Sequence, residues 1–583
     1  MNKGKTALLL VLTLVVGLLS SACNLNSAST KPEPRYHYGS TLDFIDNEEI
    51  EMVKLSEMEY VHPDEAEVKA LIEDIVQLRK KALSYESAES FLKDYYPILT
   101  RIRKIDAMCA IAALRNAINQ TDPYYMEEYE YCQDINITVY NTTLELILLL
   151  EYSPIYEDLI SYLGKDFSKN PFSGTKYIDL SFILDQYNSV ISESKVVLNN
   201  ESKTINEWLT SDSEEARYNA QCAFIEQYHD ILADIYIDIL KASKNYAKQQ
   251  GYNSYIDLMY EVNYHGNYTS EKTDDFYNSI KNHLTPIAEQ IYLNYPNVYK
   301  DVKNQNYPYS SDINPKDFLI SACSKMGGLI WETCKYMTTY ELYDYSFTQD
   351  KYPGGYSTYI PYYEAPVIFI NPSHCDIIAG ISHEFGHCVQ FYHDYGSEYA
   401  DSNPVVAEIY SQAMEYLSLK YTDVLKADEK TEILNFKLMQ FLFLNILECS
   451  ARAAFEEAAY SLNPSEISSE KLDELWLRTC KDFGLDYLYP ENIQAKSWVN
   501  ITHFFDNSCY NINYVTSVIT SLEICTLEEA EKGKGIAIYE EMINTTAGMS
   551  FTEVFEKTPL HNPLEEETII KIADFFKKKL ELE

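Results

Sequence analysis

The sequence predicts a mainly α-helical protein with one small β-sheet. Apolar residues recur at helical spacing along most of the chain, whereas strand-forming residues concentrate in one stretch, residues 356–371. The chain has 583 residues, of which 46% are hydrophobic and 23% are charged, as in an ordinary globular protein. Because this length exceeds what one small core accommodates, we expect two or more lobes.

The amino terminus has the features of a signal peptide. Two lysines precede an apolar run over residues 7–19, which is too short for a comfortable membrane span. The sequence Leu-Ser-Ser-Ala-Cys at residues 19–23 resembles the lipobox of bacterial lipoproteins, in which the cysteine is lipidated and becomes the new amino terminus. We therefore expect a signal peptide over residues 1–22, a lipid on Cys23, and a polar tether over residues 23–56. The protein is then extracytoplasmic and anchored to the bacterial cell membrane; the alternative is a secreted protein with a free cysteine here.

Two helical regions follow the tether. In the first, residues 68–83 and 140–150 are apolar at helical spacing, and a loop over residues 164–177 interrupts the pattern. We interpret residues 57–200 as an N-terminal helical domain, and residues 201–583 as a second domain.

The second region begins near Thr204, and either Ser211 or Ser213 can cap the helix that follows. Helical spacing continues over residues 233–250 and breaks at Gly251. The strand-like stretch, residues 356–371, lies in this domain and follows the flexible pair Gly354-Gly355.

A helix expected from Asp376 to Tyr395 carries the sequence His-Glu-Phe-Gly-His at residues 383–387. Two histidines four residues apart project from one helix face, so their rings can meet at one metal ion. Glu384 can reach a water molecule on that ion and accept its proton. With 11 histidines in the chain, an accidental H-E-x-x-H has a likelihood of about one per cent. The pattern indicates a zinc site; the alternative is a helix with two hydrogen-bonded histidines and a solvated glutamate.

A catalytic zinc ion needs a third protein ligand, and Glu408 is the best candidate. Asn403 is a good N-cap and Pro404 a good first residue for a helix that carries Glu408. Glu408, Ser411, Gln412 and Glu415 form one polar stripe on this otherwise apolar helix. The stripe either faces a buried metal or is a solvated face.

These motifs resemble those of the oligoendopeptidase F and thimet oligopeptidase family of zinc metallopeptidases. The resemblance covers roughly residues 200–575 and includes Gly354-Gly355-Tyr356-Ser357, residues 366–371 (PVIFIN), His503-Phe504-Phe505 with Tyr510 and Tyr514, and the weaker matches at 214–254 and 562–564. It departs from the family at Gln390, where the family often has a further histidine, and in the spacing from His503 to Tyr510.

The resemblance implies a role for each matching residue. His383, His387 and Glu408 would bind one Zn²⁺ per chain, Glu415 would support them, and Glu384 would be the general base. His503 with Tyr510 or Tyr514 would stabilise the tetrahedral intermediate. Residues 367–371, through Val367, Phe369 and Asn371, would pair as an edge strand with an extended peptide. His374 and His393 match no motif, and we interpret them as structural.

The implied fold is a zincin-like catalytic core with a small β-sheet, surrounded by helical lobes that form a deep substrate channel. The implied function is a zinc-dependent endopeptidase acting on short unfolded peptides. Two alternatives stay open: an aminopeptidase-type zinc peptidase, for which we find no segment that anchors a free amine, and a peptide-binding lipoprotein without catalysis.

The composition limits the partners. A net charge of −42 argues against nucleic acid, because phosphate binding needs clustered Lys and Arg. The eleven cysteines after Cys23 form no C-x-x-C pair, so we expect mostly buried thiols, with one or two disulfides left open. The sequence predicts no oligomeric state.

Overall fold

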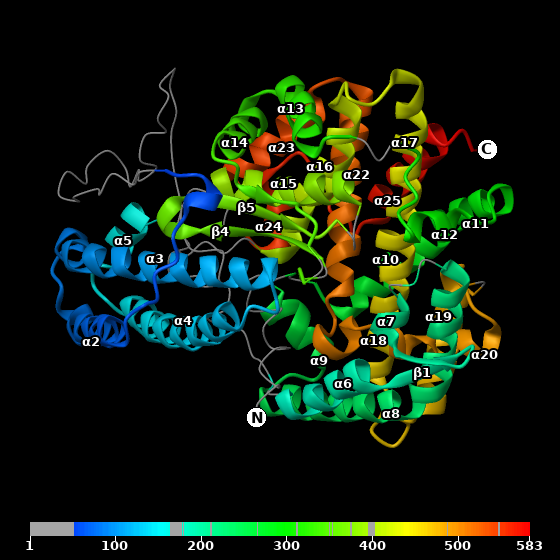
Figure 1. Cartoon of the computed structure of the whole chain (residues 1–583), viewed down its shortest axis with the longest axis horizontal. Coiled ribbons are helices and arrows are strands. Elements are labelled where there is room, and N and C mark those ends of the chain that lie inside the picture. The colour runs from blue at the N-terminus through cyan, green and yellow to red at the C-terminus, as the bar shows by residue number, and fades with distance from the viewer. Residues whose placement is uncertain are drawn as a thin grey trace.

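Helices make up most of the described residues, as the sequence predicts, whereas the strands form two small sheets rather than the single one expected (Figure 1). The computed structural model describes residues 52–582, except 164–177, 179, 210, 212, 265, 267, 310–312, 349, 353, 373–375, 394–402, 487 and 546–548. The predicted signal peptide, Cys23, most of the tether and the predicted loop over residues 164–177 lie outside the described residues.

The N-terminal helices have an apolar core of their own and lie at one side of the molecule (Figure 1). Their apolar positions recur at helical spacing, so each buries one stripe against the others. Both predicted segments, residues 68–83 and 140–150, are helical almost throughout. These helices are α2 (Glu65–Lys81), α3 (Ala88–Ile118), α4 (Pro123–Leu150) and α5 (Tyr156–Leu163).

The helices from residue 181 onward pack around a second, larger apolar core. Ser213, one of the two predicted caps, accepts the Ala216 amide at 3.2 Å and starts a 36-residue helix, which ends just before Gly251 at φ +87°. By packing, α6 and the first hairpin lie with this core; the domain boundary at residue 200 stays a prediction. The elements up to residue 339 are α6 (Ser181–Glu193), β1 (Lys195–Leu198), β2 (Glu201–Thr204), α7 (Ile205–Leu209), α8 (Glu214–Gln249), α9 (Tyr255–Leu258), α10 (Ser270–His283), α11 (Thr285–Asn294), α12 (Val298–Lys303), α13 (Pro315–Met326) and α14 (Gly328–Thr339).

The sheet near the centre of the molecule has the order β3-β5-β4. The predicted strand-like stretch, residues 356–371, is in fact two antiparallel strands joined by a short 3₁₀ turn over Pro361–Tyr363, with Glu364 at φ +47°. A two-residue strand pairs in parallel with the other side of the second strand. The sheet lies between α3 and α15 (Figure 1), and its strands are β3 (Tyr343–Asp344), β4 (Gly355–Ile360) and β5 (Ala365–Ile370).

The remaining helices surround two that follow the sheet, α15 and α16. A nearly continuous helical stretch, residues 429–461, is apolar and long enough to cross a membrane, but its most apolar window is 72% buried, as in a core helix. The helices are α15 (Ile377–His393), α16 (Pro404–Tyr421), α17 (Ala427–Gln440), the π-helical turn η6 (Phe441–Glu448), α18 (Cys449–Ser461), α19 (Ser469–Asp482), α20 (Glu491–Gln494), α21 (His503–Asp506), α22 (Asn511–Ala530), α23 (Lys534–Thr545), α24 (Phe551–Lys557) and α25 (Glu566–Lys579).

Candidate metal centre

Two helix starts are fixed by side-chain caps. Asp376 Oδ1 accepts the amides of Ile378 and Ala379 at 3.0 and 2.9 Å and starts α15. Asn403 accepts the amide of Val405 at 3.0 Å and starts α16, as the sequence predicts. Both caps satisfy amide groups that have no partner within the helix.

The two helices meet at Gly386. A Cβ placed on Gly386 would lie 2.5 Å from both the Ser411 Cα and the Tyr410 carbonyl oxygen, so only glycine permits this approach. The Tyr539 hydroxyl lies 3.3 Å from the Tyr410 carbonyl oxygen and 3.5 Å from that of Gly386, and therefore bridges both helices. From the far side, Ser521 of α22 donates to the carbonyl of Ile409 at 3.0 Å. The contact brings the middle of α15 against the first half of α16.

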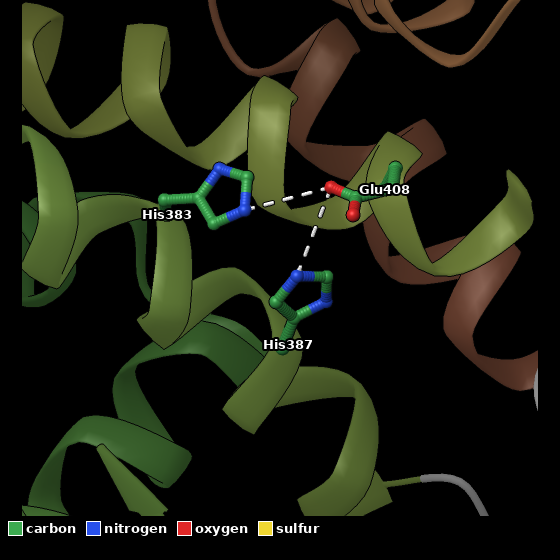
Figure 2. A group of neighbouring side chains, drawn as sticks. All are labelled: His383, His387 and Glu408. Atoms are coloured by element: carbon green, nitrogen blue, oxygen red, sulfur yellow. Dashed lines mark ion pairs between the residues drawn. The ribbon is translucent and has the colours of Figure 1, made fainter. Parts of the chain in front are cut away.

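At this crossing, His383 and His387 of α15 point toward Glu408 of α16 (Figure 2). Glu408 Oε2 lies 3.5 Å from His383 Nε2 and 3.8 Å from His387 Nε2. One possible ligand atom from each side chain lies within 4.8 Å of the other two. Ligands on a tetrahedral zinc ion, bound at about 2.0–2.1 Å, lie about 3.3 Å from one another. The donor types and spacing therefore fit a shared zinc ion.

The other nitrogen of His383 is held by Glu415. His383 Nδ1 lies 2.9 Å from Glu415 Oε1, and Lys437 donates to the other oxygen of this carboxylate. Burial raises the pKa of Glu415, but Lys437 and His383 outweigh it and lower the pKa overall. An ionised carboxylate only accepts, so Nδ1 carries the proton and Nε2 is left for a metal.

The charges at the centre favour a cation. Burial lowers the pKa of His383, but the hydrogen bond to Glu415 and the charges of Glu408 and Glu384 raise it to about 10. Burial and the charge of His383 hold the pKa of His387 well below its ordinary value. Three carboxylates around two imidazoles therefore attract one positive charge between the rings, and a divalent cation supplies it without protonating a ligand.

Glu408 itself is held by its own helix. Ser411 Oγ lies 2.9 Å from Glu408 Oε2, the oxygen that approaches both histidines. Ser411 and Gln412 are fully buried and Glu415 is 9% exposed, so the polar stripe faces the protein interior rather than solvent. Through Ser411 and Glu415 the stripe contacts the residues of the candidate metal centre.

Glu384 projects from the same helix toward the sheet. A Cβ on Gly355, at the start of β4, would lie 3.8 Å from Glu384 Oε1. Burial raises the pKa of Glu384 to about 7, although His383 and a hydrogen bond with Ser357 lower it. The carboxylate therefore stands between the candidate metal ligands and β4.

The strand predicted to bind substrate, residues 367–371, is not at the edge of the sheet. β5 lies between β3 and β4, so its backbone pairs on both sides, and Val367, Phe369 and Asn371 are buried. Asn371 Nδ2 donates to the carbonyls of Lys351 and Tyr352. Within the described residues, no strand pairs with the outer edge of β4, which is therefore the edge that an added strand can reach.

The predicted histidine and tyrosines lie together. The rings of His503 and Tyr514 are 5.9 Å apart, and those of Tyr514 and Tyr510 are 5.1 Å apart. Burial raises the pKa of both tyrosines, and the charge of Glu408 raises it further, so both remain protonated donors on the Glu408 side. Burial and the charge of Arg452 lower the pKa of His503 to about 4.

A buried glutamate that the sequence analysis missed holds this segment. Glu456 of α18 accepts the Cys509 amide at 2.7 Å and Asn511 Nδ2 at 3.2 Å. Cys509 has a φ of +66°, a conformation that costs a side-chain-bearing residue about 1–2 kcal/mol. The Tyr264 hydroxyl donates to the Ser508 carbonyl at 2.8 Å on the other side. No short-range pattern links Glu456 to the tyrosines, because more than 50 residues separate them.

Most of the described cysteines, and His393, are buried. All ten described cysteines are free and nine of them are buried, so no disulfide joins any two of them. Burial raises the pKa of Cys388, which neighbours His387, well above its ordinary value. His393 is buried, 2.9 Å from Thr333 Oγ1, as a structural histidine should be; His374 lies outside the described residues.

Several solved structures share this fold. PZ peptidase A with an inhibitor superposes with a TM-score of 0.72 at 19% identity, over 91% of this chain and 99% of that one. A Bacillus anthracis protein assigned as an oligoendopeptidase F gives 0.71 at 19% identity, over 91% and 98%. Oligoendopeptidase F of Enterococcus faecium gives 0.53 at 14% identity, over 89% and 99%. The fold is therefore that of oligoendopeptidase-like peptidases.

Two protein-family models match the sequence. The model described as "Peptidase M3 N-terminal domain" matches residues 55–172, and the model described as "Peptidase family M3" matches residues 330–573. Together they cover more than half of the sequence, and the chain belongs to peptidase family M3. No curated protein matches the sequence.

Replacing Glu415 by Gln is expected to weaken zinc binding by roughly 10- to 100-fold, because His383 loses its ionised acceptor and Lys437 its partner. Competition with a zinc chelator measures the change. Glu529→Gln is the matched control, since Glu529 pairs with Lys420 and Lys579 but contacts no metal-site residue. Equal zinc affinity in the two variants would remove the role assigned to Glu415.

Replacing Gly386 by Ala is expected to lower zinc affinity by at least about tenfold, because the added Cβ pushes α16, and Glu408 with it, away from the histidines. Gly251→Ala is the control: its Cβ meets nothing within 4 Å, although its φ of +87° costs some stability. Zinc titration of both folded variants separates the steric effect from a general loss of stability. An unchanged affinity in Gly386→Ala contradicts the prediction.

Proposed function

We propose that this M3 peptidase is a zinc-dependent endopeptidase that hydrolyses short unfolded peptides outside the cytoplasmic membrane. The observation that carries the proposal is the convergence of His383, His387 and Glu408, with Glu384 beside them. Three protein ligands with one position left open is the arrangement of catalytic rather than structural zinc. The family assignment supports a peptide as the substrate.

Zinc bound at this centre would lower the pKa of a water molecule toward neutrality and polarise the scissile carbonyl. Glu384 stands beside the ligands and would accept a proton from the attacking water and pass it to the leaving amine. Burial raises the pKa of the Glu384 carboxyl above its ordinary value, the direction that favours a proton acceptor near neutral pH. Glu415 keeps His383 oriented throughout.

The tyrosine segment supplies hydrogen-bond donors on the other side of the centre. Tyr510 and Tyr514 are both protonated, and either hydroxyl donates to the oxyanion as the carbonyl becomes tetrahedral. A donor of this kind is typically worth about 3–4 kcal/mol in the transition state. Neutral His503 packs against Tyr514 and acts with it.

The open edge of β4 lies beside Glu384 and is available to an extended peptide. Backbone hydrogen bonds to β4 would align it along the metal ligands, and such bonds read shape more than sequence. We propose broad specificity for short peptides that enter a channel between the helical lobes. Folded proteins, which cannot offer an extended segment there, would be excluded.

The proposed location rests on the amino-terminal sequence. Residues 19–23 resemble a lipobox, and the residues that follow are polar, as in a tether between a membrane and a folded body. We propose that Cys23 carries a lipid that anchors the enzyme to the outer surface of the bacterial cell membrane.

Purified protein is expected to cleave a quenched-fluorescent short peptide, to lose activity on chelation and to regain it with zinc. Glu384→Gln should keep zinc and lose about 10²- to 10⁴-fold in kcat, because the proton acceptor is gone. Zinc content by elemental analysis is the control for both proteins. Full activity in zinc-loaded Glu384→Gln would contradict the role of Glu384 as general base.

The same assay separates the alternatives. An amino-blocked peptide should be cut as readily as its free counterpart, whereas an aminopeptidase would require the free amine. Tight peptide binding without hydrolysis in zinc-loaded wild-type protein would favour a binding lipoprotein instead.

Cys23→Ser is expected to release the protein from the membrane fraction of the expressing bacterium, because the thiol that accepts the lipid is lost. Immunoblots of membrane and soluble fractions, with incorporation of a labelled fatty acid, measure the effect. The Ser21→Ala variant serves as the control. If the wild type and both variants are all found in the soluble fraction without the labelled fatty acid, Cys23 carries no lipid anchor.

A further inference from the structure

The connection between α12 and α13 contains a tightly folded stretch, residues 305–309, that has no role in the chemistry described above. We call it the 305–309 segment. Gln305 has a φ of +53°, a conformation that is unfavourable for a residue with a side chain. The amide of Tyr307 donates to the Gln305 carbonyl at 2.8 Å, and the amide of Tyr309 donates to the Tyr307 carbonyl at 2.9 Å. The rings of the two tyrosines stack with their centroids 5.1 Å apart. The segment therefore holds its side chains in fixed directions.

One side of the 305–309 segment holds the start of α15. Asp376 Oδ1, which caps this helix, also accepts a hydrogen bond from the Tyr309 hydroxyl. Gln305 Oε1 accepts the amide of Asp376 at 2.6 Å. The segment thus binds both the side chain and the backbone of the capping residue. His383 follows Asp376 by seven residues, or about two helical turns, so the position of the cap sets the position of this metal ligand.

The other side of the segment reaches the residues that orient the same histidine. The Tyr307 hydroxyl donates to Gln440 Oε1, and Lys437 Nζ donates to this same oxygen. Lys437 Nζ also lies 5.4 Å from the centre of the Tyr307 ring, whose face attracts a cation. The ammonium group of Lys437 is thereby held where it donates to Glu415, which in turn holds His383 Nδ1 at 2.9 Å. Lys437 is 1% exposed, so water does not replace these partners.

These contacts form a closed path, which runs from His383 through α16 and α17 to the 305–309 segment and returns to α15 at its cap. Neither the imidazole nor the start of its helix can turn without breaking one of the hydrogen bonds. We propose that Gln305, Tyr307 and Tyr309 are positioning residues of the metal centre, which keep His383 Nε2 directed at the metal without contacting it. The inference rests on the proposed zinc centre and adds to it residues from a distant part of the chain.

Tyr307→Phe keeps the stacked ring and removes only the hydroxyl. It is expected to lower zinc affinity, measured by competition with a chelator, about three- to tenfold, less than the loss of a direct partner of the imidazole. In the Glu415→Gln background the same change should cost almost nothing, because Lys437 then has no ionised carboxylate to hold against His383. Tyr85→Phe is the matched control, since its hydroxyl donates to Asp94 at 2.6 Å among the N-terminal helices. Unchanged affinity in Tyr307→Phe, or an equal loss in both backgrounds, overturns the proposal.

A second readout needs no metal. Tyr309→Phe should speed amide hydrogen exchange in the metal-free protein several-fold in peptides that cover residues 376–384, because the cap of α15 loses a partner, and Tyr85→Phe should not. If the wild type binds zinc while affinity and exchange are unchanged in the variants, the positioning role is refuted and the proposed function stands. If the wild type binds no zinc, the proposed metal centre fails, and the exchange experiment still decides whether the 305–309 segment holds the start of α15.

Discussion

The close approach of α15 and α16 is the constraint on which the rest of the site depends. A glutamate side chain is short, so Glu408 meets two imidazoles on another helix only if the two backbones nearly touch. Gly386 allows that contact, and the Tyr539 hydroxyl and Ser521 hold it from two sides. The caps at Asp376 and Asn403 then fix how far along each helix the facing residues lie.

Buried charge is used here for orientation more than for stability. Glu415 is paired with Lys437 and His383, and Glu448 with Lys303 and Arg452, so each carboxylate has its countercharge within the protein. Such pairs repay little more than the cost of removing both ions from water. What these pairs provide is orientation of side chains, since Glu415 fixes the imidazole ring of His383.

The sequence allowed the helices of the site to be predicted, because their signals are local. The His-Glu-Phe-Gly-His spacing, the Asn403-Pro404 start and the polar stripe through Glu408 all lie within a few turns, and the structure brings these residues together. The position of the strands in the sheet could not be predicted in the same way. Both β4 and β5 are short and contain strand-forming residues, and only the pairing of β5 with the distant residues Tyr343 and Asp344 places β5 in the middle.

Residues that act from a distance could not be predicted. Lys437 and Glu456 reach the site from helices that the sequence analysis did not connect to it, and a lone lysine or glutamate in a helix usually faces solvent. Their roles become visible only once the helices are packed.

The burial of Cys388 links the reactivity of this thiol to opening of the candidate metal centre. This thiol adjoins His387 on α15, and it is shielded from oxidants by the packing of neighbouring helices rather than by a disulfide. Any opening that exposes it must also separate the helices around His387. The rate at which Cys388 is alkylated therefore reports how often the folded site comes apart, from inside the catalytic helix itself.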